Sequence, residues 1–265
     1  YTTLFRSNTP ADTVDVIAAA SRQVIARVSV VRGDRLYVIP FESNNKTQLS
    51  GGNKIDGDLV TFNAWEHSIR VNNVLSIGHV VDIVKHPKVP DRDLFVFDTK
   101  TDERVATVDT LGTLLYGLAV DSKGRVFIAQ ADARNDANGR SGTKKHGLAE
   151  LDNRAFLNQI TRVGIKNGKS EAATFFNLEP LPPKHPTPDE ALATPYAIQV
   201  SGDDSTLIVS AAASDKVFTV DANTGKVLGR VKVDAVPRGI ALESTAAGKT
   251  SQAWVLNAVS NTVSL

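Results

Sequence analysis

The sequence contains no cysteine, which excludes disulfides, thiolate-bound metals and a C-x-x-C-H haem attachment from these 265 residues. Methionine is also absent, even at position 1, so we expect that Tyr1 is not the natural start and that any signal peptide lies upstream. No apolar run approaches the ~20 residues that a membrane-spanning helix needs. The sequence therefore predicts no membrane span within the chain.

The chain also lacks an excess of positive or negative charge. The formal net charge is +1, with 30 basic and 29 acidic side chains interspersed along the chain. A nucleic-acid-binding domain carries a clustered basic footprint, often with aromatic residues between the charges, and neither pattern occurs. We therefore predict that nucleic acid is not among its partners.

Helical patterns are nearly absent, and what recurs instead is a strand, a tight turn and a second strand. In the alignment of these units Asp98 matches Asp221, and Asp102 matches Gly225. The matching segments are residues 13–28, 95–108 and 217–231, and residues 261–265 match residues 12–16. Repeats of this size predict an array architecture, and a chain that starts and stops inside one repeat is expected to be a fragment of a longer protein.

The best-preserved unit gives the fold class. Four short runs rich in β-branched and aromatic residues alternate with a period of two. They are residues 196–200, 206–210, 216–220 and 226–231, joined by connections rich in Gly, Asn and Asp. Such connections suit hairpins, and four antiparallel strands that recur as a unit describe a propeller blade. We predict an all-β propeller over residues 8–265, with about four blades visible, as part of a larger ring such as one of seven blades.

Two long insertions interrupt the repeats, at residues 42–90 and 132–195. Inside the second, residues 160–165 and 172–176 have the weaker pattern of a third and a fourth strand. Both insertions leave at the end of a second strand, so we expect them on one face of the disc, where a binding surface is elaborated. Residues 1–7 resemble a peptide that arises when sequencing adapter is translated, and we predict a non-native leader there.

The repeats resemble those of the YVTN β-propeller family. The signature "x-V-x-N" is matched by residues 254–257, and "D-x-x-T-G-K-V" is matched by residues 221–227. The resemblance covers roughly residues 8–41, 93–131 and 195–265 and leaves the insertions out. It implies the fold and says little about function.

Residues 115–121 and 193–204 carry a narrower resemblance. They are similar to bacterial exported proteins in which a YVTN-type propeller precedes a c-type cytochrome region like the di-haem peroxidases. This resemblance implies a periplasmic or cell-surface location and a haem domain outside the present chain. Within the chain it assigns haem binding to no residue, and covalent attachment is excluded since no cysteine is present.

One loop concentrates side-chain oxygens around a glycine turn, as a Ca²⁺ site requires. Its candidate ligands are Asp132, Asn135, Asp136 and Asn138. The bidentate Glu of an EF-hand is missing downstream, and Asn and Asp are also ordinary residues of a solvated loop. Both interpretations stay open.

The remaining candidates for chemistry are isolated. The five histidines lie in the two insertions without the spacing of a metal pair, and the serine-nucleophile, Walker A and dinucleotide motifs are absent. The pairs Asp203-Asp204 and Asp102-Glu103 are expected in hairpin turns. Four arginines either line a channel as anion contacts or point into solvent. They are Arg104, Arg162, Arg230 and Arg238.

These observations favour a non-catalytic scaffold that docks a partner protein or a neighbouring domain, and they make an enzyme the less favoured class. The alternative is a metal-dependent hydrolase of the lactonase or gluconolactonase kind, which holds a divalent metal in the propeller channel. Against it, the inner strands show mainly Gly, Ala, Val and Ile. A surface-layer module without a small ligand is a third possibility.

Overall fold

The computed structural model describes residues 3–8, 13–18, 23–26, 28–41, 91–134, 154–245 and 249–265. These residues form strands, turns and connecting segments, and none of them is helical. No helix in this part of the chain has the length and apolarity needed to cross a membrane.

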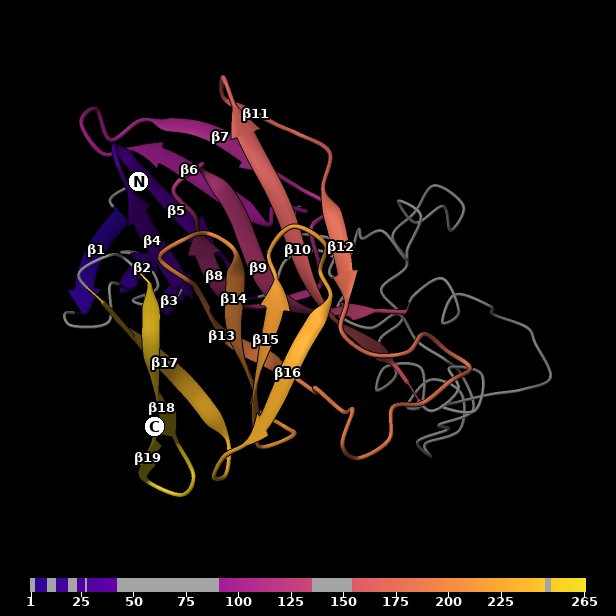
Figure 1. The fold of residues 1–265 in the computed structure, drawn as a ribbon. Coiled ribbons are helices and arrows are strands. Elements are labelled where there is room, and N and C mark those ends of the chain that lie inside the picture. Colours follow the sequence, from indigo (N-terminus) through magenta and orange to yellow (C-terminus); the bar gives the residue numbers. More distant parts are fainter. Residues whose placement is uncertain are drawn as a thin grey trace, which may run out of the picture.

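The strands assemble into successive antiparallel sheets, as predicted for a propeller (Figure 1). The first full blade contains β4 (Val28–Arg32), β5 (Arg35–Ile39), β6 (Leu94–Asp98) and β7 (Arg104–Val108). The second contains β8 (Leu114–Val120), β9 (Arg125–Ala133) and β10 (Phe156–Lys166), with β11 (Lys169–Ser170) and β12 (Thr174–Asn177) both pairing with β10. The third contains β13 (Pro195–Val200), β14 (Thr206–Ala211), β15 (Lys216–Asp221) and β16 (Val227–Lys232).

The fourth blade contains β17 (Pro237–Ser244), β18 (Thr250–Asn257) and β19 (Thr262–Ser264). A separate N-terminal sheet is formed by β1 (Thr3–Asn8), β2 (Thr13–Ala18) and β3 (Gln23–Ala26). In each blade the first strand is the inner one, because β4 packs against β8, β8 against β13, and β13 against β17. The expected third and fourth strands inside the second insertion are β10 and β12.

The inter-blade core explains why the inner halves of the blades are apolar on both faces. Strand β9 places Val126 and Ile128 in the cluster shared with the first blade. The alternate residues Phe127 and Ala129 lie in the cluster shared with the third blade. A strand covered on both faces loses the in-out alternation of a half-exposed strand and becomes a continuous apolar run. Successive blades of the propeller therefore pack face to face through these apolar side chains.

The repeated turns have a common chemistry, and it accounts for the sequence alignment. The Asp221 carboxylate accepts hydrogen bonds from the N–H groups of Asn223 and Thr224, at 2.9 and 2.7 Å. Asp98 makes the matching contacts in the first blade, to Lys100 and Thr101. Gly225 closes its turn at φ 75°, and Asp102 adopts φ 57° at the matching position. Asp tolerates this left-handed region better than most residues, so the turn survives without glycine.

The β13–β14 turn gives a prediction about pH dependence. Asp203 accepts hydrogen bonds from the hydroxyls of Ser201 and Ser205, at 2.6 and 2.7 Å, and these contacts lower its pKa from 3.8 to about 2. A lowered pKa stabilises the fold above the unfolded value, and this contribution is lost as the pH falls from about 4 to about 2. We expect Asp203→Asn to lower the melting temperature at pH 7, with the gap to the parent protein closing across that window. A difference in melting temperature between the two proteins that stays constant from pH 7 to pH 2 would contradict the assignment.

Candidate functional site

Four side chains lie in a row where the inner strands begin, and we call them the aromatic row. Tyr116 of β8, Tyr196 of β13 and Arg238 of β17 occupy the same position of the repeat. The Tyr116 ring centroid is 5.6 Å from that of Phe41, which follows β5, and 5.6 Å from that of Tyr196. The Arg238 guanidinium lies over the Tyr196 ring, 5.2 Å from its centroid. The row therefore runs across all four blades.

Each of the three inner strands is irregular at this position. The pairing register shifts between Leu115 and Gly117 in β8, and again between Pro195 and Ile198 in β13. A third shift occurs in β17, between Pro237 and Gly239. A bulge leaves a residue outside the regular ladder and redirects its side chain, and bulges are frequent beside functional sites. The repeat thus brings the Tyr116 ring and the Arg238 guanidinium to the Tyr196 ring.

The backbone just before two of these side chains adopts an uncommon conformation. Thr194 and Val236 have φ values of 55° and 58°, although both are β-branched. Such residues are genuine outliers in this region and persist only where their surroundings enforce it. The Asn158 side-chain oxygen accepts the Thr194 N–H at 3.0 Å, and Asp215 accepts the Val236 N–H at 2.9 Å. In both cases the preceding blade holds the strained residue.

A buried ion pair supports one of these contacts. Arg154 and Glu179 form a salt bridge of 2.8 Å, and their side chains are only 9% and 3% exposed. Glu179 also accepts hydrogen bonds from the Asn158 side chain at 2.9 Å and from the Leu192 N–H at 2.7 Å. This network positions Asn158 and, through it, the start of β13.

Close packing of two backbones brings Tyr116 beside Tyr196. A Cβ atom on Gly117 would lie 2.1 Å from the Tyr196 carbonyl oxygen, so only glycine fits between β8 and β13. Burial raises the pKa of Tyr116 above 10.0, and the neighbouring Tyr196 raises it further. The Tyr116 hydroxyl therefore stays protonated, and available as a donor, throughout the physiological pH range.

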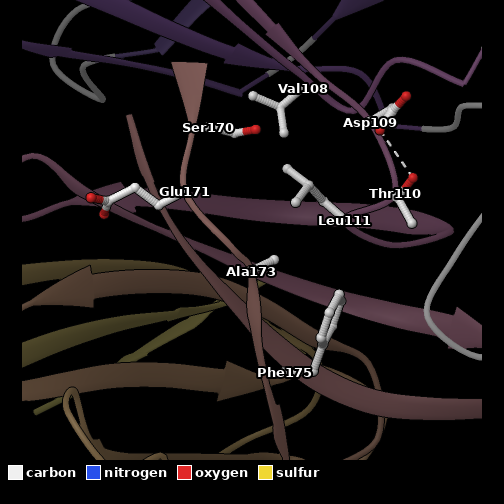
Figure 2. A pocket seen from close by; sticks show the side chains of 8 residues that line it. All are labelled: Val108, Asp109, Thr110, Leu111, Ser170, Glu171, Ala173 and Phe175. Atoms are coloured by element: carbon white, nitrogen blue, oxygen red, sulfur yellow. Dashed lines mark hydrogen bonds between the residues drawn. The ribbon is translucent and has the colours of Figure 1, made fainter. Parts of the chain in front are cut away.

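A hollow lies between the first and second blades (Figure 2). Its volume is about 380 Å³, and Val108, Leu111, Ala173 and Phe175 form its apolar wall. Glu171, although at its edge, points away in Figure 2, and its carboxylate lies where a Cβ on Gly164 would be. Binding sites need a few convergent polar groups, and this hollow is poor in them. The aromatic row is the better candidate.

The predicted Ca²⁺ ligands are described only in part. Asp132 is fully buried at the end of β9, and its carboxylate accepts the Thr113 hydroxyl at 3.1 Å. Asn135, Asp136 and Asn138 lie outside the described residues, so the Ca²⁺ loop stays a prediction. Within the described ranges, no three His, Asp or Glu side chains come together as metal ligands.

The arginines fall into two groups. Arg104 and Arg230 point into solvent. Arg162 lies over the Phe176 ring at 5.2 Å and donates to the Asn223 carbonyl of the next blade at 2.7 Å. Arg238 is the arginine that joins the aromatic row. In the sequence Arg238 was one candidate anion contact. The strand pattern alone did not connect Arg238 with Tyr116 and Tyr196 at the same repeat position.

The other isolated candidates have structural roles or lie outside the description. Asp203 stays within its own turn, as expected, whereas Asp204 accepts the Ser122 N–H at 3.0 Å and so joins two blades. His185 is exposed. The other four histidines are His67, His79, His86 and His146, and they lie outside the described residues.

The architecture is that of a β-propeller, and comparison with solved structures agrees with this class. Hydrazine synthase from Kuenenia stuttgartiensis superimposes with a TM-score of 0.55 at 12% identity, covering 99% of this chain and 67% of that one. A streptogramin B lyase structure gives a TM-score of 0.46 at 10% identity, and this chain spans 60% of its length. No protein-family profile matches the sequence, and a search of curated proteins found no match. At 12% identity the likeness to hydrazine synthase is one of fold.

Proposed function

We propose that this propeller is a non-catalytic scaffold, that a further blade of the same polypeptide completes it, and that the completed propeller docks a neighbouring domain. The observation that carries the proposal is the outward face of the fourth blade. Trp254, Leu256 and Val263 are 45%, 52% and 60% exposed there. Trp254 and Leu256 alternate along β18, and Val263 of β19 pairs directly with Leu256, so the three lie on one face. An apolar face of this kind typically marks an interaction surface.

The internal repeat indicates what covers such a face. By pairing register, Trp254 corresponds to Ile208 of the third blade and to Phe127 of the second. Both of these residues are buried against the following blade, Phe127 completely and Ile208 to 7% exposure. The surface that covers Ile208 consists of Ile240 and Val255, flanked by Leu242 and Ala253. We therefore propose that a further blade of the same repeat, from the same polypeptide, packs on Trp254.

An extended chain tests this proposal. Residues 220–265 would be repeated after Leu265 in a Trp65→Phe background, so that the added segment supplies a fourth strand before the next inner strand and Trp254 is the reporter in the parent sequence. The added copy would carry Trp→Phe at its own tryptophan. We expect the Trp254 emission to shift to shorter wavelength and acrylamide quenching to fall, because the added sheet removes water from the indole.

The matched control is the same extension with its copies of Ile240, Leu242, Ala253 and Val255 changed to serine, which should leave Trp254 exposed. Two outcomes would reject the proposal. Trp254 could stay equally quenchable in the extended chain. Alternatively, Trp254 could already be protected from quenching in the unextended chain. Protection that increases with protein concentration would indicate that a second copy covers Trp254, and protection independent of concentration would indicate that the N-terminal sheet covers it.

A docked domain outside the propeller is a separate part of the proposal, and its nature rests on the narrower resemblance. The similarity of residues 115–121 and 193–204 to exported propeller–cytochrome proteins supports a c-type cytochrome as that domain, and a periplasmic or cell-surface location. In this proposal the propeller positions the cytochrome and does not attach the haem covalently, since it has no cysteine. A C-x-x-C-H motif in the same reading frame would support it, and a different adjoining domain would refute the cytochrome assignment.

A further inference from the structure

The aromatic row has the chemical groups of a binding site that the scaffold role does not use. Phe41 is 52% exposed, Arg238 is exposed, and the two tyrosines are half-buried. Within the part of the chain that the structure describes, neither tyrosine hydroxyl makes a hydrogen bond and Arg238 makes no ion pair. Tyrosine hydroxyls without partners and an unpaired guanidinium are donors available to a ligand.

We propose that the aromatic row binds a planar organic carboxylate, with its ring against the aromatic side chains and its carboxylate on Arg238. Aromatic rings attract flat apolar groups through offset or edge-to-face contact, and the three rings provide a continuous apolar strip for this contact. A guanidinium presents a planar fork that matches a carboxylate with two hydrogen bonds. The tyrosine hydroxyls add neutral donors, and none of the four side chains carries negative charge.

The position of the row agrees with this role. The start of each inner strand pairs with the end of the second strand, as Leu114 with Ala131 in the second blade. The row therefore lies on the side of the disc where β5 and β9 end. A backbone hydrogen bond of 2.9 Å from the Leu115 N–H to the Phe41 carbonyl fixes the junction of the first two blades there.

The strained backbone supplies an independent observation. Thr194 and Val236 precede Pro195 and Pro237 with positive φ, and each is directly followed by a proline and then a member of the row. Residues before proline normally adopt extended backbone, so this conformation is unfavourable twice over. Strain of this kind gathers at ligand sites, where it holds side chains in place before the ligand arrives.

The test is a titration of the full chain with naphthalene-2-carboxylate, in which binding is measured by calorimetry and by ligand fluorescence. Naphthalene-2-methanol, a neutral analogue of similar shape, is titrated in parallel. We expect saturable binding of the carboxylate and weaker binding of the alcohol. Arg238→Gln should weaken carboxylate binding about tenfold or more, because it removes hydrogen bonds to a charged group, and should leave alcohol binding unchanged. Tyr196→Leu should weaken binding of both ligands.

Two control variants locate the site. Arg230→Gln removes an exposed arginine outside the row, and Trp254→Lys removes the apolar face of the fourth blade. Neither should alter binding, and a thermal melt of each variant confirms that it is folded. The proposal is overturned by an absence of saturable binding at millimolar carboxylate, by unchanged binding in Arg238→Gln, or by loss of binding in Trp254→Lys. The further blade is tested at Trp254, and the carboxylate site is tested at Arg238 and Tyr196. Because the residues differ, failure of one proposal leaves the other intact.

Discussion

Replacing Glu179 with alanine is expected to lower the free energy of unfolding by about 3–5 kcal/mol, because it leaves the Arg154 guanidinium buried without a counter-charge. The Arg154 side chain is only 9% exposed, so water cannot replace the lost carboxylate. The Leu192 N–H and the Asn158 side chain lose their acceptor in the same step. A loss of this size is a large part of the total stability of a typical domain. Urea denaturation followed by circular dichroism measures it.

An exposed ion pair provides the matched control. Lys100 and Asp34 form a contact of the same length, 2.8 Å, but their side chains are 71% and 61% exposed. Asp34→Asn should leave the urea midpoint almost unchanged, since water screens and replaces that interaction. If Glu179→Ala yields no folded protein, Glu179→Gln retains an acceptor oxygen and should show a smaller loss. Equal midpoints for Asp34→Asn and both Glu179 variants would contradict the role assigned to the buried pair.

Placing a methyl group at Gly117 is the second change with a large expected effect. The new Cβ would meet the Tyr196 carbonyl oxygen at 2.1 Å, far inside van der Waals contact. The clashing atom belongs to the backbone of an inner strand, so it cannot turn aside as a flexible side chain would. Overpacking a core costs about 1–3 kcal/mol and occasionally more, and we expect Gly117→Ala to reach at least the upper end of that range. The melting temperature and the urea midpoint should both fall.

Gly229 is the control for this prediction. A Cβ there would lie 3.6 Å from the Thr219 hydroxyl oxygen, which is ordinary contact, and its φ is not positive. Gly229→Ala should therefore leave stability nearly unchanged. If Gly117→Ala were as stable as Gly229→Ala, the close approach of β8 and β13 would not be a requirement of the fold.

Much of the architecture was predictable because it rests on local chemistry. The period-two runs and their turns gave the four strands of the third blade, and the match of Asp98 with Asp221 is explained by shared turn hydrogen bonds. The second and third strands of the first two blades pair as the blade pattern predicts, β5 with β6 and β9 with β10. Strand pairing of neighbours along the chain needs little information beyond the sequence pattern.

The candidate site was less predictable. Tyr116 and Tyr196 were visible as members of similar segments, and Arg238 as one of four comparable arginines. Their grouping depends on three bulges and on how closely successive blades approach. Nothing in a strand's own alternation marks the residue that leaves the ladder. Glu179 was not singled out at all, because its partner Arg154 lies 25 positions away, before β10, whereas Glu179 follows β12.

The sequence by itself determined the blade: hydrophobic alternation, Gly/Asn/Asp turns and their recurrence are local properties, and each blade is built from neighbouring segments. Only the tertiary structure decided which faces of the blades are covered and which side chains meet between them. Phe127, Ile208 and Trp254 occupy one repeat position, yet two are buried and the third is 45% exposed. That difference comes from the next blade in space, because burial and electrostatic pairing depend on non-local packing.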